Sequence, residues 1–193
     1  MREARGTLGS TVSLDSVGED RRFQLRHEDP FVAPPEARDA ARRLRGHLAQ
    51  PVTVWTAGEP GEPAGLTVSS LLVAEGEPAH VLGLVGTHTD LLEAAQRSGA
   101  FIVHVLEEPD ERLAARFAGA YPGDPFEGLD LAWTEWGPRL AGARSVASCR
   151  LVGIEQVGYQ QLVRGVIEQV TIGEDRLPLL HQLGRYRALR HER

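Results

Sequence analysis

The sequence predicts a mainly β protein: a closed antiparallel barrel with peripheral helices. Short apolar runs alternate with turns rich in Gly and Pro, the pattern of many short strands. Only two or three segments have helical spacing, and no Gly-x-Gly-x-x-Gly motif follows a strand. Because a parallel dinucleotide-binding sheet needs regular strand–helix alternation and that motif, we do not expect one.

Each element follows from its local pattern. A helix is expected over residues 34–48, because Pro and Glu suit a helix start and the Ala and Leu residues after them share one side. Two more helices are expected at residues 90–98 and 110–120. The expected strands span residues 52–56, 64–74, 80–85, 101–106, 147–156 and 161–172. Residues 121–142 are rich in Pro, Gly and aromatics, and they are too long for an idle turn.

Length and composition indicate one domain of residues 35–193 preceded by an N-terminal extension, residues 1–34. The extension is polar and non-periodic, so partial disorder is expected there. The net charge of −6 argues against a nucleic-acid partner. No secretory signal and no apolar run of membrane-spanning length are visible, so a cytoplasmic protein without a membrane partner is expected.

The titratable residues exclude several chemistries. All 21 basic residues counted as Lys or Arg are arginine, so a lysine Schiff base is excluded. The single cysteine, Cys149, rules out a disulfide within the chain. No two of the 7 histidines have metal-ligand spacing on one expected face, so no metal site is expected. No Ser-His-Asp grouping can be recognised from spacing, which disfavours a hydrolase.

Two clusters of hydroxyl side chains are the candidate binding residues. Thr67, Ser69 and Ser70 follow a strand and a turn, and small hydroxyl-bearing residues suit close approach to a flat polar ring or a phosphate. Thr87 and Thr89 directly precede the expected helix at Asp90, whose N-terminus favours anions. Asp90 is itself a good N-cap candidate, and an acid beside a phosphate is unfavourable. Ordinary strand, turn and cap roles remain the alternative for all of these residues.

Six segments in this order resemble the flavin reductase-like, FMN-binding split-barrel family. They are LTVSS at 66–70, PAHVLGLV at 78–85, THTDLLEAA at 87–95, SGAFIVHVL at 98–106, LAARFAG at 113–119 and LLHQLGRYRAL at 179–189. The resemblance implies a split β-barrel, antiparallel and Greek-key-like, working as a homodimer. It implies an NAD(P)H:flavin reductase, an oxidoreductase that supplies reduced FMN, or FAD, to a partner monooxygenase.

The resemblance also assigns roles to residues. It implies that Thr67, Val68, Ser69, Ser70, Thr87, His88, Thr89, Phe117 and Ala118 contact the flavin. For Phe117, whose helix has apolar residues at i, i+4 and i+8, core packing is the alternative. His104 stands where the family commonly has Asn, and it is expected to be structural or to touch ligand. Residues 121–142 would cover the flavin, lie at the dimer interface or simply cover core.

The match departs from the family after the strand that ends near Val157. Many members have Gly-Asp-His there, residues associated with handling reduced nicotinamide, whereas this chain has Gly158-Tyr159-Gln160. Tyr159 can stack on a ring and Gln160 can hydrogen-bond an amide, so both are candidates for the nicotinamide or substrate side. No side chain is expected to act as acid or base. Two interpretations follow: a reductase using NADH or NADPH, or a divergent flavoprotein that keeps FMN and does not use either. A structural or interaction module on the same barrel, without flavin, is a third.

Overall fold

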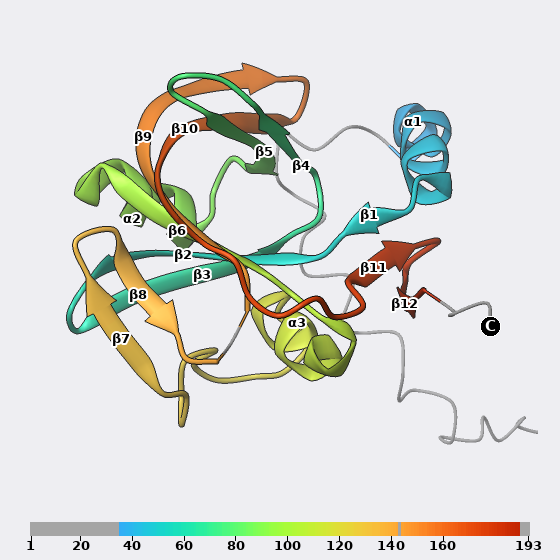
Figure 1. Ribbon diagram of the computed structural model, residues 1–193. Coiled ribbons are helices and arrows are strands. Elements are labelled where there is room, and N and C mark those ends of the chain that lie inside the picture. The colour runs from blue at the N-terminus through green and yellow to red at the C-terminus, as the bar shows by residue number, and fades with distance from the viewer. Residues whose placement is uncertain (1–34, 143, 190–193) are drawn as a thin grey trace, which may run out of the picture. The chain divides into compact units, whose positions relative to one another are not determined.

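A seven-stranded antiparallel sheet forms the centre of the structure (Figure 1). The computed structural model describes residues 35–142 and 144–189, and the predicted N-terminal extension lies outside them. In spatial order the sheet contains β3 (Glu62–Val68), β2 (Thr53–Glu59), β6 (Ala100–Val105), β9 (Val146–Val157), β10 (Gln160–Thr171), β5 (His80–Gly86) and β4 (Leu71–Ala74).

The sheet curls into a barrel that is split between its two edge strands, β3 and β4. These edges are consecutive in the chain and are joined by Ser69 and Ser70, which belong to neither strand. The backbone N–H of Leu84 in β5 donates to the carbonyl of Ser70 at 3.0 Å, which fixes this connection to the barrel wall. The expected mainly β, split-barrel fold is therefore confirmed.

The barrel interior is filled by a stacked pair of aromatic rings. Trp55 and Phe101 lie with ring centroids 4.8 Å apart and nearly parallel. Strand glycines make room for them: a Cβ on Gly83 would lie 2.5 Å from the Trp55 ring, and one on Gly165 would lie 2.5 Å from the Phe101 ring. Helix α2 (Asp90–Ser98) adds its apolar face to this core through Leu91, Leu92, Ala94 and Ala95.

A second apolar cluster lies on the outer face of β2 and β6. Side chains alternate across a strand, so Val52 and Val54 point away from Trp55. They pack with Leu106 and with residues from helix α3 (Glu111–Phe117), the loop after it and strand β8 (Gly137–Leu140). Four further strands complete the described part of the fold: β7 (Leu131–Thr134), which pairs with β8, and β11 (Leu179–Gln182), which pairs with β1 (Gln50–Pro51) and β12 (Arg185–Ala188).

Several boundaries differ from those expected. The predicted strand 64–74 is two strands, because the chain crosses the split in the barrel at Ser69 and Ser70. The predicted helix 110–120 begins with a short 3-10 turn, η2 (Glu108–Asp110), and its α-helical part ends at Phe117. Residues 121–142, where no strand is expected, contain the hairpin β7–β8. Helix α1 (Pro35–His47) has nearly the predicted extent.

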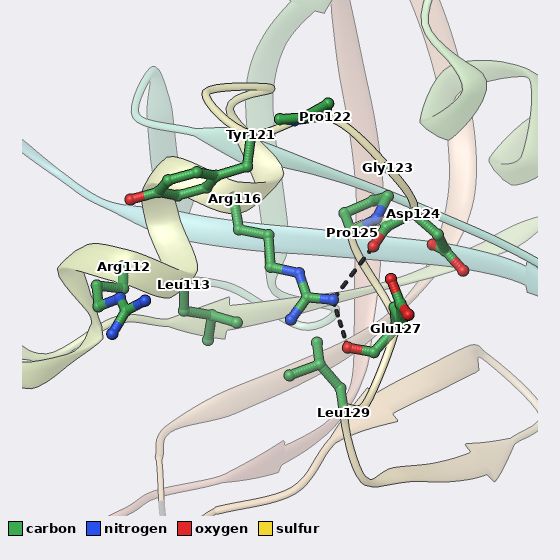
Figure 2. Close-up of a pocket in the computed structure, with 10 residues that line it drawn as sticks. All are labelled: Arg112, Leu113, Arg116, Tyr121, Pro122, Gly123, Asp124, Pro125, Glu127 and Leu129. Carbon is green, nitrogen blue, oxygen red and sulfur yellow. Dashed lines mark hydrogen bonds between the residues drawn. The ribbon is translucent and has the colours of Figure 1, made fainter.

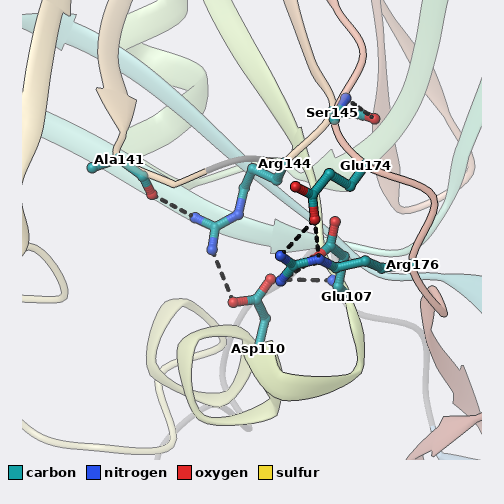
Figure 3. Close-up of polar contacts among 8 residues, drawn as sticks. Glu107, Asp110, Ala141, Arg144, Ser145, Glu174 and Arg176 are labelled. Atoms are coloured by element: carbon teal, nitrogen blue, oxygen red, sulfur yellow. Dashed lines mark hydrogen bonds and ion pairs between the residues drawn. The ribbon is translucent and has the colours of Figure 1, made fainter.

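A cluster of charged residues ties the loops beneath the barrel together (Figure 3). Arg144 donates to Asp110 at 2.9 Å and to the carbonyl of Ala141 at 3.1 Å. Arg176 pairs with Glu107 at 3.6 Å and with Glu174 at 2.9 Å. Since Asp110 also accepts from the backbone N–H of Glu107, the cluster fixes the start of α3 against the segment that leads into β11.

The tight turn between β11 and β12 contains a residue in an unfavourable conformation. Leu183 and Gly184 both have positive φ, 52° and 75°, as a type I′ turn requires. A branched side chain with positive φ costs about 1 kcal/mol, and Asn tolerates it far better. We expect L183N to raise the free energy of unfolding in urea by about 1 kcal/mol. L183A keeps the strain, so its free energy of unfolding should not rise. An unchanged free energy of unfolding in L183N would show that the turn adopts this conformation without cost.

Candidate functional site

Ser69 and Ser70 lie at the split of the barrel, where both side chains are half-buried. The Ser69 hydroxyl donates to Oε1 of Gln50 at 3.3 Å, and the Ser70 carbonyl is taken by Leu84. Gln50, on β1, is a residue that sequence reasoning missed, since a lone polar residue before a strand carries no local signal. The two serines thus combine small polar side chains with backbone between two strands, which suits close approach of a flat ligand.

Thr67 and Val68, the last residues of β3, have structural contacts. The Thr67 hydroxyl donates to the carbonyl of Ala114 at 2.6 Å and so ties β3 to α3. Val68 is buried in the barrel core, and its carbonyl accepts the hydroxyl of Thr53 at 2.5 Å. Any contact of these two residues with a ligand therefore comes through groups that these bonds leave available, such as the acceptor lone pairs of the Thr67 hydroxyl.

The Thr87–His88–Thr89 turn leads from β5 into α2. Thr89, not Asp90, is the N-cap: its Oγ1 accepts the N–H of Leu92 at 3.3 Å. The alternative that Asp90 caps the helix is thereby corrected, because Asp90 is already the first helical residue. Thr87 and Thr89 are half-buried and His88 is exposed. Asp90 and Glu93 in the first turn partly oppose the attraction of this helix end for a phosphate.

The hairpin between β9 and β10 places Tyr159 and Gln160 beside this turn. Gln160 is paired with Val157 across the hairpin and with Gly86, the last residue of β5, on the other side. Gly158 has φ 58°, which allows the tight turn, and Tyr159 is 54% exposed. The register of β5 with β10 therefore places Gln160 opposite Gly86, the residue directly before Thr87, although the two strands are far apart in the chain.

Phe117 and Ala118 lie elsewhere in this single chain. The Phe117 ring is 3% exposed and packs edge to face against Phe126 at 5.0 Å. It also fills the space beside Gly65, where a Cβ would come within 2.5 Å of the ring. These are the contacts of a core residue that packs against the middle of β3, whereas Ala118 is exposed directly after α3.

His104 holds strand β8 to the barrel. The ring is 0% exposed; Nδ1 lies 3.1 Å from the carbonyl of Val54, and Nε2 accepts the N–H of Leu140 at 3.1 Å. This pairing requires the tautomer with hydrogen on Nδ1. Burial, reinforced by the charges of Arg144 and Arg139, lowers the pKa of His104 to about 4. Cys149 is likewise buried, which raises its thiol pKa to about 12 and makes it unreactive.

The described residues also line open pockets away from the two serines. A pocket of about 460 Å³ lies between α3 and the loop after it (Figure 2). Arg116 reaches across its floor and donates to the carbonyls of Asp124 and Glu127, while Tyr121 and Leu129 add apolar surface. None of the residues predicted to contact flavin lines it. We take the connection at Ser69 and Ser70 as the site, because hydroxyls and backbone groups converge there, whereas in the pocket Nη2 of Arg116 already donates to two backbone carbonyls.

The donor set at the split fits a flavin. The polar edge of its ring requires hydrogen-bond donors and acceptors, which Ser69, Ser70 and their backbone offer. A phosphate requires donors, which Thr87, Thr89 and the N-terminus of α2 offer. In the part of the chain that the structure describes, no group of three or more His, Cys, Asp or Glu could hold a metal ion, and no helix is long and apolar enough to cross a membrane.

Comparison with known proteins gives the class. A family model described as "Flavin reductase like domain" matches residues 45–190. The reductase component of 4-hydroxyphenylacetate 3-monooxygenase from Thermus thermophilus is 33% identical over 152 residues, covering 79% of this chain and 97% of that protein. FMN reductase (NADH) RutF 2 from Methylorubrum extorquens is 31% identical over 159 residues, covering 80% and 92%.

Solved structures of similar proteins agree with the family that the sequence comparisons indicate. The NADH:FAD oxidoreductase SgcE6 of Streptomyces globisporus is similar with a TM-score of 0.73 and 29% identity, over 83% of this chain and 98% of that one. The same enzyme is also known in complex with NAD and FAD fragments, and that structure matches with a TM-score of 0.73 and 28% identity, over 82% of this chain and 96% of that one. The chain therefore belongs to the flavin reductase-like family. At the level of the family, the expectation of an oxidoreductase that uses flavin and a nicotinamide is confirmed.

A role of Thr89 in phosphate binding can be separated experimentally from its role as the N-cap of α2. T89A should weaken FMN binding more than riboflavin binding, by about tenfold, because only FMN carries the phosphate. It should also cost about 1 kcal/mol of stability through loss of the cap. T89S keeps a hydroxyl and should restore both. The measurement is flavin fluorescence titration with each ligand, and equal losses for FMN and riboflavin would show that Thr89 does not contact the phosphate.

Proposed function

We propose that this protein is the NADH-dependent reductase component of a two-component monooxygenase. The observation that carries the proposal is the convergence of Ser69, Ser70, the Thr87–Thr89 turn and the Tyr159–Gln160 hairpin around the end of β5. Relatives that bear the names of such reductase components match most of this chain. A cytoplasmic location, where NADH is available, is part of the proposal.

Bound flavin supplies an electron acceptor for the hydride of a reduced nicotinamide. The chain has to hold the two rings face to face and exclude water, since hydride transfer needs no protein acid or base. Ser69 and Ser70 hold the polar edge of one ring. Tyr159 offers a face against which the second ring can stack, and Gln160 offers donor and acceptor groups for a carboxamide.

Anaerobic addition of NADH to the purified protein with FMN or FAD tests this function. Loss of the visible flavin absorption at a catalytic protein concentration would support the reductase. A tightly bound flavin that neither NADH nor NADPH reduces would instead support the divergent flavoprotein suggested by the loss of Asp and His at Tyr159 and Gln160. Transfer of the reduced flavin to an oxygenase is then tested by coupled substrate hydroxylation.

The role of Tyr159 has its own test. Y159A should raise the KM for NADH about tenfold with flavin affinity unchanged, because the exposed ring is needed only for the nicotinamide. Y159F keeps the ring and should resemble the unmodified protein. Steady-state kinetics at saturating flavin measures the effect. If Y159A changed flavin affinity instead, the hairpin would belong to the flavin side of the site.

We further propose that two copies assemble and complete the site. Apolar side chains stand exposed on the edge strand β4, where Leu72 is 72% and Val73 is 62% exposed, directly after Ser70. An edge strand with exposed apolar residues favours association. Sedimentation of the purified protein should give a dimer, and a flavin-binding monomer would contradict this arrangement.

A further inference from the structure

The backbone around Ser69 is fixed on both sides, which leaves the hydroxyl as the part that can adapt to a ligand. On one side the Val68 carbonyl accepts the Thr53 hydroxyl at 2.5 Å, and on the other the Ser70 carbonyl accepts the N–H of Leu84 at 3.0 Å. A serine hydroxyl can donate one hydrogen bond and accept others. The direction of its single hydrogen therefore decides whether a ligand meets a donor or an acceptor.

Gln50 sets that direction. Its Oε1 lies 3.3 Å from Oγ of Ser69 and accepts the hydroxyl hydrogen. Because the hydroxyl has only one hydrogen, the lone pairs of Oγ are what remain for a ligand. The separation is at the long end of the range for such bonds, so the preference that it imposes on the hydroxyl is modest. While this bond exists, Ser69 presents an acceptor.

The position of Gln50 comes from the pairing of β1 with β11 (Figure 1). Gln50 pairs with His181, and the N–H of Val52 donates to the carbonyl of Leu179 at 2.9 Å. Pro51 follows Gln50 and restricts its backbone to extended conformations. A strand near the C-terminal end of the described chain therefore holds the amide beside Ser69.

The neighbouring hydroxyl, on Ser70, is in a different state. Within the described part of the chain, no hydrogen bond involves the Ser70 hydroxyl, so its hydrogen can turn towards a ligand. The connection therefore offers an acceptor at Ser69 next to a donor at Ser70. The polar edge of a flavin ring carries one N–H, at N3, between two carbonyl oxygens. An acceptor beside a donor matches N3–H and an adjacent carbonyl.

We propose that Gln50 is a positioning residue that turns the Ser69 hydroxyl into an acceptor for the N3–H of the flavin. Ser70 donates to a carbonyl oxygen next to N3. Gln50 acts through Ser69 and requires no contact of its own with the ring. The inference rests on the proposed function, because it takes the connection at Ser69 and Ser70 as the flavin site.

The test compares FMN with FMN methylated at N3, which has no hydrogen to donate there. Fluorescence titration of the full chain should show FMN bound at least about tenfold more tightly, since the analogue loses a hydrogen bond and adds a methyl group. Q50M has a side chain of similar length without the amide acceptor. The ratio of the two affinities should fall about threefold in Q50M, because Ser69 can then donate to a ring carbonyl of either ligand.

Two variants show whether the acceptor itself matters. Q50E keeps an oxygen that accepts the Ser69 hydrogen, so it should retain the affinity ratio. Three arginines line the pocket beside position 50 and favour the ionised carboxylate: Arg42, Arg43 and Arg45. The matched control Q182M removes another glutamine amide from the same small sheet, one that donates to the carbonyl of His47 at 3.2 Å. It should leave the ratio unchanged, and circular dichroism confirms that each variant is folded.

A second measurement avoids the bulk of the methyl group. Nitrogen NMR of bound FMN, isotopically labelled at N3, reports the hydrogen bond from N3–H directly. The N3 resonance should have the same position in the unmodified protein, Q50E and Q182M. In Q50M it should move towards its position in S69A, which lacks the acceptor.

A double variant shows whether Gln50 acts through Ser69. S69A lowers the affinity ratio by removing the acceptor, and S69A/Q50M should lower it no further, because the two residues form one unit. The proposal is overturned if Q50M keeps the ratio and the N3 resonance of the unmodified protein. It is also overturned if Q50M lowers the ratio further in the S69A background. Failure of the unmodified protein to bind any flavin would refute the proposed function instead, so the two failures are distinguishable.

Discussion

Replacing Ser69 or Ser70 with phenylalanine is expected to weaken flavin binding by about a hundredfold or more, because it removes polar contacts and fills the space that a flat ring needs. Both serines are half-buried at the split of the barrel and belong to neither β3 nor β4. The structural bond at this point, from Leu84 to the Ser70 carbonyl, uses backbone and survives the substitution. Fluorescence titration with FMN and FAD measures the loss.

Two controls separate the effect of filling the ligand space from the effect of losing a hydroxyl hydrogen bond. The alanine variants S69A and S70A keep the space and should lose only about tenfold, the effect of one hydrogen bond to a ligand. A132F places the same ring on the exposed strand β7 and should bind flavin normally. Thermal unfolding should be similar for all of them. Unchanged flavin affinity in both phenylalanine variants would show that the connection at Ser69 and Ser70 is not part of the site.

The second large effect is expected at His104, whose burial makes stability depend on pH. The pKa of His104 is lowered to about 4 in the folded protein from its ordinary 6.5, so the folded state binds fewer protons than the unfolded state. Stability is therefore complete above the unfolded pKa and falls as the pH drops from there towards 4. Between about pH 7 and pH 5 the loss should be about 2 kcal/mol.

Removing the imidazole tests its structural role. H104A leaves the buried N–H of Leu140 and the carbonyl of Val54 without their partner and creates a cavity, so we expect a loss of about 3 kcal/mol at neutral pH. H104N, with the residue common in the family, keeps a donor for Val54 and has no titratable ring. Its urea stability should be nearly constant over the same pH range, and an equal slope in both proteins would assign the acid sensitivity to other groups.

The two predictions concern different cores of the same barrel. Ser69 and Ser70 lie in the wall of the barrel, whose interior holds the Trp55–Phe101 stack. His104 instead connects β6 to the second apolar cluster, on the outer face of β2 and β6. Thr56 reinforces that second link by donating to the carbonyl of Pro138 in β8. Acid should therefore loosen the hairpin β7–β8 before it affects the connection at Ser69 and Ser70. Hydrogen exchange tests this, because the amide of Leu140 should lose protection at a higher pH than the amide of Leu84.

The sequence by itself determined the elements whose signal is local. Short apolar runs between turns rich in Gly and Pro predicted β5, β6, β9 and β10, and helical spacing with favourable ends predicted α1 and α2. The hydroxyl clusters at Ser69–Ser70 and Thr87–Thr89 were also visible as short motifs, and six segments in order indicated the family. The split at Ser69 was not visible, because a strand that crosses between two sheet edges reads the same as a continuous one.

Only the tertiary structure decided which distant residues meet. The register of β5 with β10 brings Gln160 to Gly86, and the pairing of β1 with β11 brings Gln50 to His181. The same folding gave His104 and Phe117 structural partners, Leu140 and Gly65, that local pattern does not identify. Long-range pairing depends on how complete strands and helices fill space together, so no short window of sequence carries it.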